Sequence, residues 1–215
     1  MSAREAAARA GAAAHRRVLP RAFYARPTLD VTRELIGKLL VHETPAGITS
    51  GVIVETEAYI GESDPACHAA PGPTKRNAPL YGRPGIAYVY LNYGIHYLVN
   101  AVTEPEGSPA AVLIRALEPF DGESLMRRRR ARGTGKSPES YERAALCRGP
   151  GNLTRALGIS LRHNRRDLTG SDLRIEDAGL PPREVAWSTR IGINVGKEHP
   201  WRCFAADSDA VSGRR

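Results

Sequence analysis

Two strand-like apolar runs separated only by a tight corner set the strongest constraint on how this chain can fold. The runs cover residues 86–93 and 95–102, and the corner between them is Tyr93-Gly94. Glycine readily adopts the positive φ that such short turns require, so the pattern is typical of a β-hairpin. Because the two strands of a hairpin are antiparallel, the sequence predicts a sheet that contains antiparallel pairs.

Further strand-like segments lie on both sides of this hairpin. The run 51–59 alternates, with Val52 and Val54 on one face and Glu57 and Tyr59 on the other. Other strands are expected at 39–43, 110–117, 174–176, 187–194 and 202–205. Together they predict a mixed, largely antiparallel sheet.

Helices are expected between these strands. Residues 28–37 form one, with Asp30 as the candidate N-cap, and residues 126–132 form another. A third begins at Ser137-Pro138, and a fourth covers 152–157. Since no repeat or linker interrupts the pattern, it indicates one α+β domain over 18–206. A flexible basic tail is expected over 1–17 and disorder over 207–215.

Composition excludes several classes of protein. No run of about 18 apolar residues is present, as a transmembrane helix would need, and no secretory signal is recognised. We therefore expect no membrane association, and a cytoplasmic, nucleoid-associated location if the source is bacterial. The three cysteines form no C-x-x-C pair, which disfavours a zinc finger. Cys67 and His68 have no further ligands nearby in the sequence, so no metal is expected.

The formal net charge of +8 favours a polyanionic partner, because cationic side chains neutralise phosphates and release counterions. Of the 31 cationic residues only four are lysines, so the excess is carried by arginine. An arginine-rich composition also follows from a GC-rich genome, and composition alone does not separate these two explanations.

The residues with chemical potential gather around the hairpin and a long connection. Residues 61–85 are rich in Gly and Pro, and a loop of this length inside a compact domain is usually functional. His68 lies in this loop, directly after the strand that carries Glu57 and Tyr59. A bland alternative stays open, in which Glu55 and Glu57 are both solvated.

Tyrosines are more frequent than phenylalanines, at eight against three. Tyrosine combines a flat stacking surface with a polar tip, which suits a site that grips a nucleobase. Tyr88 and Tyr90 share a face of the hairpin strand, and Tyr93 lies at its tip. An exposed aromatic ring there is a candidate wedge for separating stacked bases, although it could instead fold back onto the hairpin.

At this point the sequence resembles a known family. Six segments carry the resemblance: VETEAYIG (54–61), DPACHAAPGPTKRNAPLYG (64–82), GIAYVYLNYGIHYLVN (85–100), AVLIRALEP (111–119), CRGPGNLTRALGI (147–159) and RIGIN (190–194). Together they are similar to the 3-methyladenine DNA glycosylase family, in particular the alkyladenine (N-methylpurine) type. The likeness runs from about residue 20 to 205, with the motifs in the order of the family.

The resemblance implies a role for each matching residue. Glu57 matches the general base that activates water. Arg115 and the backbone carbonyl of Ile191 match the groups that hold this water. The flipped base would lie among Tyr59, His68 and Tyr90, while Asn100 would discriminate against the exocyclic amino group of guanine. Tyr93 matches the hairpin residue that enters the DNA, and Lys75, Arg76 and Asn77 match a stretch near the DNA backbone.

The resemblance also implies a reaction and a partner. The expected activity is monofunctional hydrolysis of the N-glycosidic bond of damaged purines in double-stranded DNA, by a monomer without metal or organic cofactor. None of the lysines lies at a matched catalytic position, so no Schiff base is expected. Asn92, beside the wedge tyrosine, and the cluster Arg127–Arg130 depart from the family pattern. Two rival functions are a non-catalytic nucleic-acid-binding module and a formyltransferase-like or RNA-acting domain with a similar barrel.

Overall fold

The structure is a computed structural model that describes residues 16–213. Most of the predicted basic tail, 1–17, therefore lies outside the described residues. Arg16 and Arg17 already belong to the fold, because Arg16 pairs with Asp121 at 2.7 Å and Arg17 begins the first strand. The folded domain thus starts slightly before the predicted boundary at residue 18.

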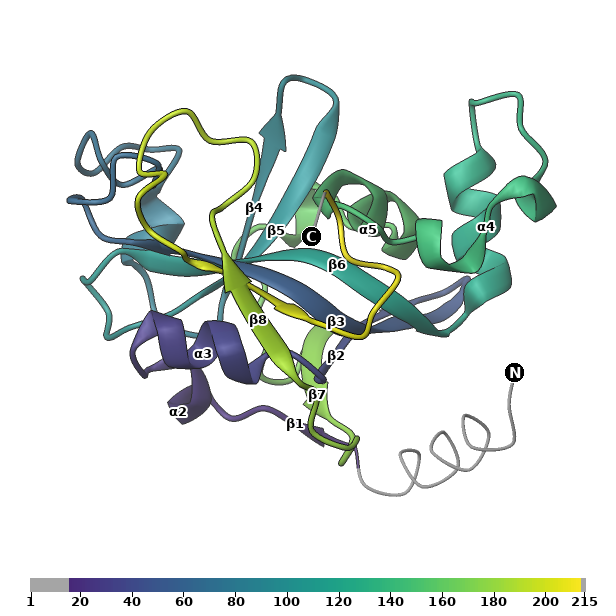
Figure 1. Cartoon of the computed structure of the whole chain (residues 1–215), viewed down its shortest axis with the longest axis horizontal. Coiled ribbons are helices and arrows are strands. Elements are labelled where there is room, and N and C mark those ends of the chain that lie inside the picture. The colour runs from purple at the N-terminus through teal and green to yellow at the C-terminus, as the bar shows by residue number, and fades with distance from the viewer. Residues whose placement is uncertain (1–15, 214–215) are drawn as a thin grey trace.

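A single nine-stranded sheet organises the chain (Figure 1). The main path of neighbouring strands is β1-β7-β2-β3-β6-β5-β4, and β9 pairs with both β3 and β8. Every pairing among the described strands is antiparallel, so the predicted antiparallel character is confirmed and no parallel pair occurs in residues 16–213. The strands are β1 Arg17–Val18, β2 Leu39–Thr44, β3 Gly47–Ile60, β4 Ala87–Asn92, β5 His96–Val102, β6 Ala110–Asp121, β7 Leu173–Asp177, β8 Val185–Ser188 and β9 Arg202–Ala205.

Short helices flank this sheet. In Figure 1, α2 and α3 lie below the sheet, α5 lies beside the protruding β4–β5 hairpin, and α4 lies beyond α5. The α-helices are α2 Arg21–Tyr24, α3 Thr28–Glu34, α4 Glu123–Ala131 and α5 Pro150–Leu157. The 3-10 turns are η1 Ala78–Tyr81, η2 Pro138–Ser140, η3 Arg143–Ala145 and η4 Leu161–His163. The α+β class predicted from the sequence is confirmed.

Several predicted boundaries are wrong for local reasons. The helix expected over 28–37 ends at Glu34, and Pro27 rather than Asp30 occupies its N-cap. Ser137 does cap, by accepting a hydrogen bond from the Glu139 amide, but the element that follows is a single 3-10 turn. The strand expected over 187–194 is β8, which ends at Ser188 and is followed by a loop.

The long strand β3 is the centre of the sheet and is buried on both faces, which the alternating pattern did not predict. One edge pairs with β2 over residues 47–52 and with β9 over 55–57, while the other edge pairs with β6. The register with β6 shifts on both sides of Glu55, and Arg115 of β6 falls between the pairs Glu55–Ala116 and Thr56–Ile114. A bulge of this kind re-aims side chains, here at the position of two acidic residues and an arginine.

Disorder was expected over 207–215, but residues 208–212 pack against the fold, while residues 214–215 lie outside the described residues. Ala210 and Val211 are 1% and 6% exposed, and Ala210 joins the apolar cluster that contains Val54 and Phe120. Ser212 is also buried and hydrogen-bonded to the sheet. The segment is short and contains few apolar residues, so its sequence alone did not reveal this packing.

Candidate active site

A cavity of about 390 Å³ opens between the β4–β5 hairpin, the loop that follows β3 and residues 191–193. Its wall contains many aromatic and polar side chains. These are Tyr59, His68, Tyr88, Tyr90, Tyr93, Asn92, Asn100 and Arg115. The predicted pocket residues, which are scattered over the sequence, therefore meet in one place.

Aromatic rings from two elements contact each other in this wall. The rings of His68 and Tyr90 lie 4.5 Å apart between centroids, and the rings of Tyr88 and Tyr90 lie 5.3 Å apart. The His68 Nδ1 atom and the Tyr88 hydroxyl are 2.8 Å apart. Burial, and secondarily Arg76, lower the pKa of His68, while burial raises the pKa of Tyr88 to about 12. Both rings are therefore neutral near pH 7, as a stacking surface requires. The sequence analysis noted Tyr88 but did not assign it to the site.

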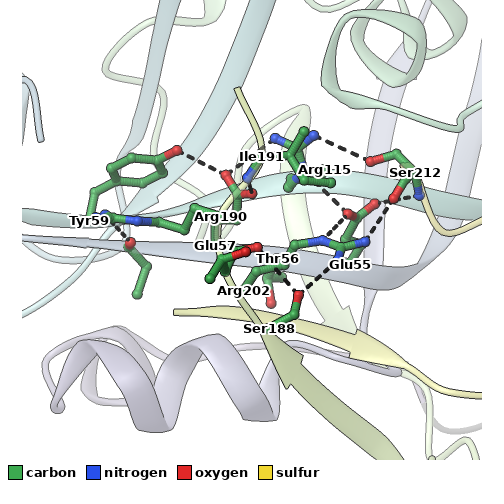
Figure 2. Close-up of polar contacts among 12 residues, drawn as sticks. Glu55, Thr56, Glu57, Tyr59, Arg115, Ser188, Arg190, Ile191, Arg202 and Ser212 are labelled. Atoms are coloured by element: carbon green, nitrogen blue, oxygen red, sulfur yellow. Dashed lines mark hydrogen bonds and ion pairs between the residues drawn. The ribbon is translucent and has the colours of Figure 1, made fainter. Parts of the chain in front are cut away.

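Glu57 is completely buried behind this wall, which excludes the alternative in which it is solvated. Three groups donate hydrogen bonds to its carboxylate (Figure 2). The Tyr59 hydroxyl and Arg115 Nη1 approach Oε2 at 2.9 and 3.2 Å, and the Ile191 amide approaches Oε1 at 2.7 Å. All three donor residues line the cavity, so Glu57 lies directly next to its wall.

Opposing effects act on the pKa of Glu57. Burial raises this pKa, because a charged carboxylate loses its hydration in the interior. Arg115, the Ile191 amide and the Tyr59 hydroxyl act in the opposite direction, and the net shift is upward. A carboxylate with a raised pKa accepts protons more readily than an ordinary glutamate, which suits a general base.

A second buried acid, Glu55, lies beside Glu57 and was not predicted as a site residue. It accepts hydrogen bonds from Arg202 Nε at 2.7 Å and from Arg115 Nε at 3.3 Å. Arg115 therefore contacts both acids at once, and the two carboxylates raise its pKa although burial acts to lower it. Arg202 and Glu55 stand 147 positions apart in the chain, so their pairing has no local sequence signal.

Arg190 is another functional candidate that the sequence analysis missed. Its guanidinium group forms a fully buried ion pair with Asp64, at 2.6 and 2.9 Å, and lies 4.7 Å from the ring centre of Tyr59. Its neighbour Ile191 presents the amide that binds Glu57. Arg190 thus fixes both a ring of the cavity wall and the backbone beside the carboxylate. Only its place in the RIGIN segment hinted at a role.

The hairpin carries an exposed apolar tip above the cavity. Tyr93 is 85% exposed and Ile95 is 72% exposed, so the alternative in which Tyr93 folds back onto the hairpin is excluded. Tyr93 has a φ of 48° and Gly94 a φ of 69°, the paired positive values of a type I′ turn. Left-handed backbone at a bulky residue costs about 1–2 kcal/mol, and such strain is common at functional sites.

The remaining predicted residues separate into two groups. Asn100 is buried, donates to the Tyr88 carbonyl at 3.0 Å and lines the cavity. Lys75 and Arg76 are exposed, and Arg76 lies 5.9 Å from the ring centre of Tyr90.

Asn77, predicted with Lys75 and Arg76 to contact DNA, is instead buried. Its side chain binds the Thr74 amide and the carbonyls of His68 and Gly72. The side-chain amide is fully used inside the loop, which argues against the predicted DNA contact for Asn77.

One group of side chains outside the cavity has the composition of a metal site. His42, His163 and Asp172 offer ligand atoms within 4.8 Å of one another. Their surroundings oppose a cation, because Arg162 contacts His163 and Arg166 contacts Asp172. His42 Nδ1 also binds the Leu157 carbonyl at 2.7 Å. These contacts describe a packed polar cluster, and none of the three residues lines the cavity.

The cluster Arg127–Arg130, which departs from the family pattern, is largely structural. Arg127 pairs with Glu123 one helical turn earlier, at 2.7 Å. Arg129 and Arg130 donate to the carbonyls of Leu157 and Leu146 at 2.6 and 2.8 Å. These three arginines fasten α4 to its neighbours, while Arg128 is exposed.

A buried carboxylate held by an arginine, next to a cavity lined by aromatic rings, has the groups that acid–base chemistry on a flat ring substrate would use. The chain belongs to the methylpurine-DNA glycosylase family, whose model matches residues 22–209. It is therefore a DNA glycosylase, a hydrolase of N-glycosyl bonds that acts in DNA repair.

Similar proteins from bacteria and archaea carry the name 3-methyladenine DNA glycosylase. The relative from Rubrobacter xylanophilus is 54% identical over 171 residues, which cover 79% of this chain and 84% of that protein. Those from Methanocella arvoryzae and Chlorobium luteolum are 46% and 45% identical, and each alignment covers 92% of this chain and 96% or 97% of the relative. None of the helices in residues 16–213 has the length and apolar character needed to span a membrane.

Proposed function

We propose that this protein flips alkylated or deaminated purines out of duplex DNA and hydrolyses their N-glycosidic bonds, acting as a monomer. The substrate class comprises 3-methyladenine, 7-methylguanine, hypoxanthine and ethenoadenine. One observation carries the proposal: the buried Glu57 is held by Tyr59, Arg115 and Ile191, which themselves line an aromatic cavity.

The hairpin supports the flipping step. Removing a base from the stack costs a few kcal/mol, and the cost is lowest for a damaged or mispaired base. Tyr93 stands at the tip with most of its ring exposed, so it is free to enter the space that the base leaves. The exposed Ile95 adds apolar surface beside it. Filling the gap offsets part of the cost of unstacking.

The cavity supports recognition of the extruded base. Stacking on an aromatic ring stabilises a base by about 1–3 kcal/mol. Tyr59, His68 and Tyr90 offer such rings, and the family resemblance gives Asn100 the role of rejecting the amino group of guanine. Because its side-chain amide nitrogen already donates to the Tyr88 carbonyl, the orientation of Asn100 is fixed before the base arrives.

The chemical step follows from the charge distribution around Glu57. Water attacks C1′ and transfers a proton to Glu57, while the bond to the purine breaks and its electron pair leaves with the base. The transition state has oxocarbenium character, which the negative charge of Glu57 stabilises. Arg115 and the carbonyl of Ile191 orient the water. A cationic base such as 3-methyladenine leaves readily, whereas hypoxanthine requires a proton or a hydrogen bond on the leaving base.

A lyase step is not part of the proposal. Cleavage through a Schiff base requires an amine near C1′. None of the cavity-lining residues is a lysine, and the two lysines nearest to them in sequence, Lys75 and Lys197, are both exposed. We assign Lys75 and Arg76 to contacts with DNA phosphates instead.

The substitution Glu57→Gln tests this function, because it removes the base while keeping the size of the side chain. We expect release of hypoxanthine from a duplex to fall at least about 100-fold, the lower range for positioned base catalysis. Binding to the same duplex should persist. Abasic sites measure the first effect and fluorescence anisotropy the second. Full activity in the variant would refute the assignment.

A further inference from the structure

The buried acid Glu55 is held from three directions. Arg202 Nε and Arg115 Nε donate to Oε1, at 2.7 and 3.3 Å, and the backbone amide of Ser212 donates to Oε2 at 2.8 Å (Figure 2). Glu55 is completely buried and lies on the same strand as Glu57, two residues before it. Its function therefore lies in its contacts with protein groups.

Ser212 reaches this acid from the C-terminal segment and uses all of its polar groups there. Its amide binds Glu55, its carbonyl accepts from Arg202 Nη2 at 2.7 Å, and its hydroxyl accepts from Arg115 Nη2 at 3.3 Å. The buried Ala210 and Val211 anchor the approach of the segment. Ser212 thus contacts Arg115, the arginine that also binds Glu57.

Arg115 divides its guanidinium group among three partners. Nε binds Glu55, Nη1 binds Glu57 and Nη2 binds Ser212. Because guanidinium is planar and rigid, fixing two of its corners determines where the third corner points. Glu55 and Ser212 therefore aim Nη1 at the carboxylate of Glu57.

We infer that Glu55 and Ser212 are positioning residues for the Glu57–Arg115 pair, and that the C-terminal segment 208–212 is part of the active site. We call Glu55, Glu57, Arg115, Arg202 and Ser212 the carboxylate network. The network holds two carboxylates and two guanidinium groups, so its charges balance. The catalytic meaning of this arrangement rests on the proposed function of Glu57.

Two substitutions in the carboxylate network affect Glu57 in opposite directions. Ser212→Ala removes one support of Arg115, so the Glu57 anion is less stabilised and its pKa should rise further. Glu55→Gln removes a neighbouring negative charge that raises the pKa of Glu57, so this pKa should fall. A merely structural role in packing predicts no such pair of opposite shifts.

The experiment is a carbon-13 NMR titration of the glutamate carboxyls, with the Glu57 resonance assigned from Glu57→Gln. Wild type, Ser212→Ala and Glu55→Gln are compared with the control Ser188→Ala. Ser188 accepts a hydrogen bond from Arg202 Nη1, whereas Glu55 and Ser212 bind the Nε and Nη2 atoms of this arginine. The control Ser188→Ala therefore also removes a serine hydroxyl from an arginine, but not from Arg115. Single-turnover release of hypoxanthine is measured on the same four proteins.

We expect an upward shift of the Glu57 pKa in Ser212→Ala, a downward shift in Glu55→Gln and none in Ser188→Ala. Base release should fall about tenfold in Ser212→Ala, as for the loss of one hydrogen bond to a charged group. If Glu55→Gln does not fold, the Glu57 pKa in Ser212→Ala alone tests the inference. A Glu57 pKa that stays at the wild-type value, or that shifts equally in the control, overturns the inference. If the Glu57 pKa shifts as expected but the wild-type protein releases no hypoxanthine, the positioning role is supported and the proposed function is refuted.

Discussion

At the scale of single residues, the proposed role of Glu57 as the general base ties the pH range of activity to its pKa. A general base is active only when it is deprotonated, and burial raises the pKa of Glu57 above its ordinary value of 4.5. As the pH falls through this raised pKa, Glu57 gains a proton and the rate falls. The acid limb of activity should therefore lie above pH 4.5.

Tyr59→Phe tests this dependence on pH. The Tyr59 hydroxyl lowers the pKa of Glu57 by hydrogen bonding, so its removal should move the acid limb to higher pH while the ring stays in place. The single-turnover rate of hypoxanthine release, measured from acid to neutral pH, gives the position of the limb. A limb that stays at the wild-type pH would show that the hydroxyl does not act on Glu57.

The buried pair Arg190–Asp64 makes a prediction about stability. Both side chains are completely buried, and removing one partner of such a pair costs about 3–5 kcal/mol. Asp64→Asn should therefore lower the free energy of unfolding by this amount. Asp177 pairs with Lys38 at a similar distance, 2.7 Å, but is 45% exposed, so Asp177→Asn should cost less than about 1 kcal/mol. Urea titrations of the two variants give this comparison, and equal losses would contradict it.

Residue identity alone predicted some of the site but not all of it. Glu57, Tyr59, His68 and Tyr90 were found because an acid and aromatic rings cluster in family-like segments. Glu55 was noted on the strand without a role, because its partners Arg202 and Ser212 lie 147 and 157 positions away. Long-range pairing between charged side chains leaves no local pattern in a sequence.

At the scale of elements, the β4–β5 hairpin was the most predictable feature, whereas the burial and the bulge of β3 were not predicted. The corner Tyr93-Gly94 defined the hairpin directly, through turn chemistry. The run 51–59 was recognised as a strand, but its alternation did not predict burial on both faces. Neither did it predict the shift of register near Glu55, because a bulge depends on the partner strands as much as on the strand itself.

The hairpin tip makes a prediction that separates side-chain bulk from backbone shape. Tyr93→Ser should weaken capture of a stable lesion such as ethenoadenine by roughly 10–100-fold, since a stacked base is worth about 1–3 kcal/mol. Tyr93→Leu retains an apolar side chain with the same backbone requirement, so it should lose less. Single-turnover rates, measured with enzyme in excess of DNA but below saturation, report capture of the lesion. Equal rates in wild type and Tyr93→Ser would argue against a wedge.

At the scale of the whole molecule, the protruding hairpin marks the face by which DNA is proposed to approach. The hairpin projects from one side of the sheet, whereas α2 and α3 lie on the other side in Figure 1. Three arginines of the described residues, Arg115, Arg190 and Arg202, are buried in ion pairs and cannot neutralise DNA. Each of these arginines is balanced by a buried acid, so such pairs contribute nothing to the net charge of +8, and the position of each exposed cation decides its contribution to DNA binding.

Salt dependence tests where DNA binds on this surface. Each neutralised phosphate contributes about −0.9 to the slope of log affinity against log salt concentration. Lys75 and Arg76 are exposed in the loop beside the cavity, so Lys75→Ala and Arg76→Ala should each make the slope less steep by about 1. Arg33 is equally exposed but lies on α3, away from the hairpin, and Arg33→Ala should leave the slope unchanged. Anisotropy titrations at several salt concentrations give these slopes. If the slope changes equally in all three variants, the position of the cation does not matter, and DNA does not approach by the hairpin face.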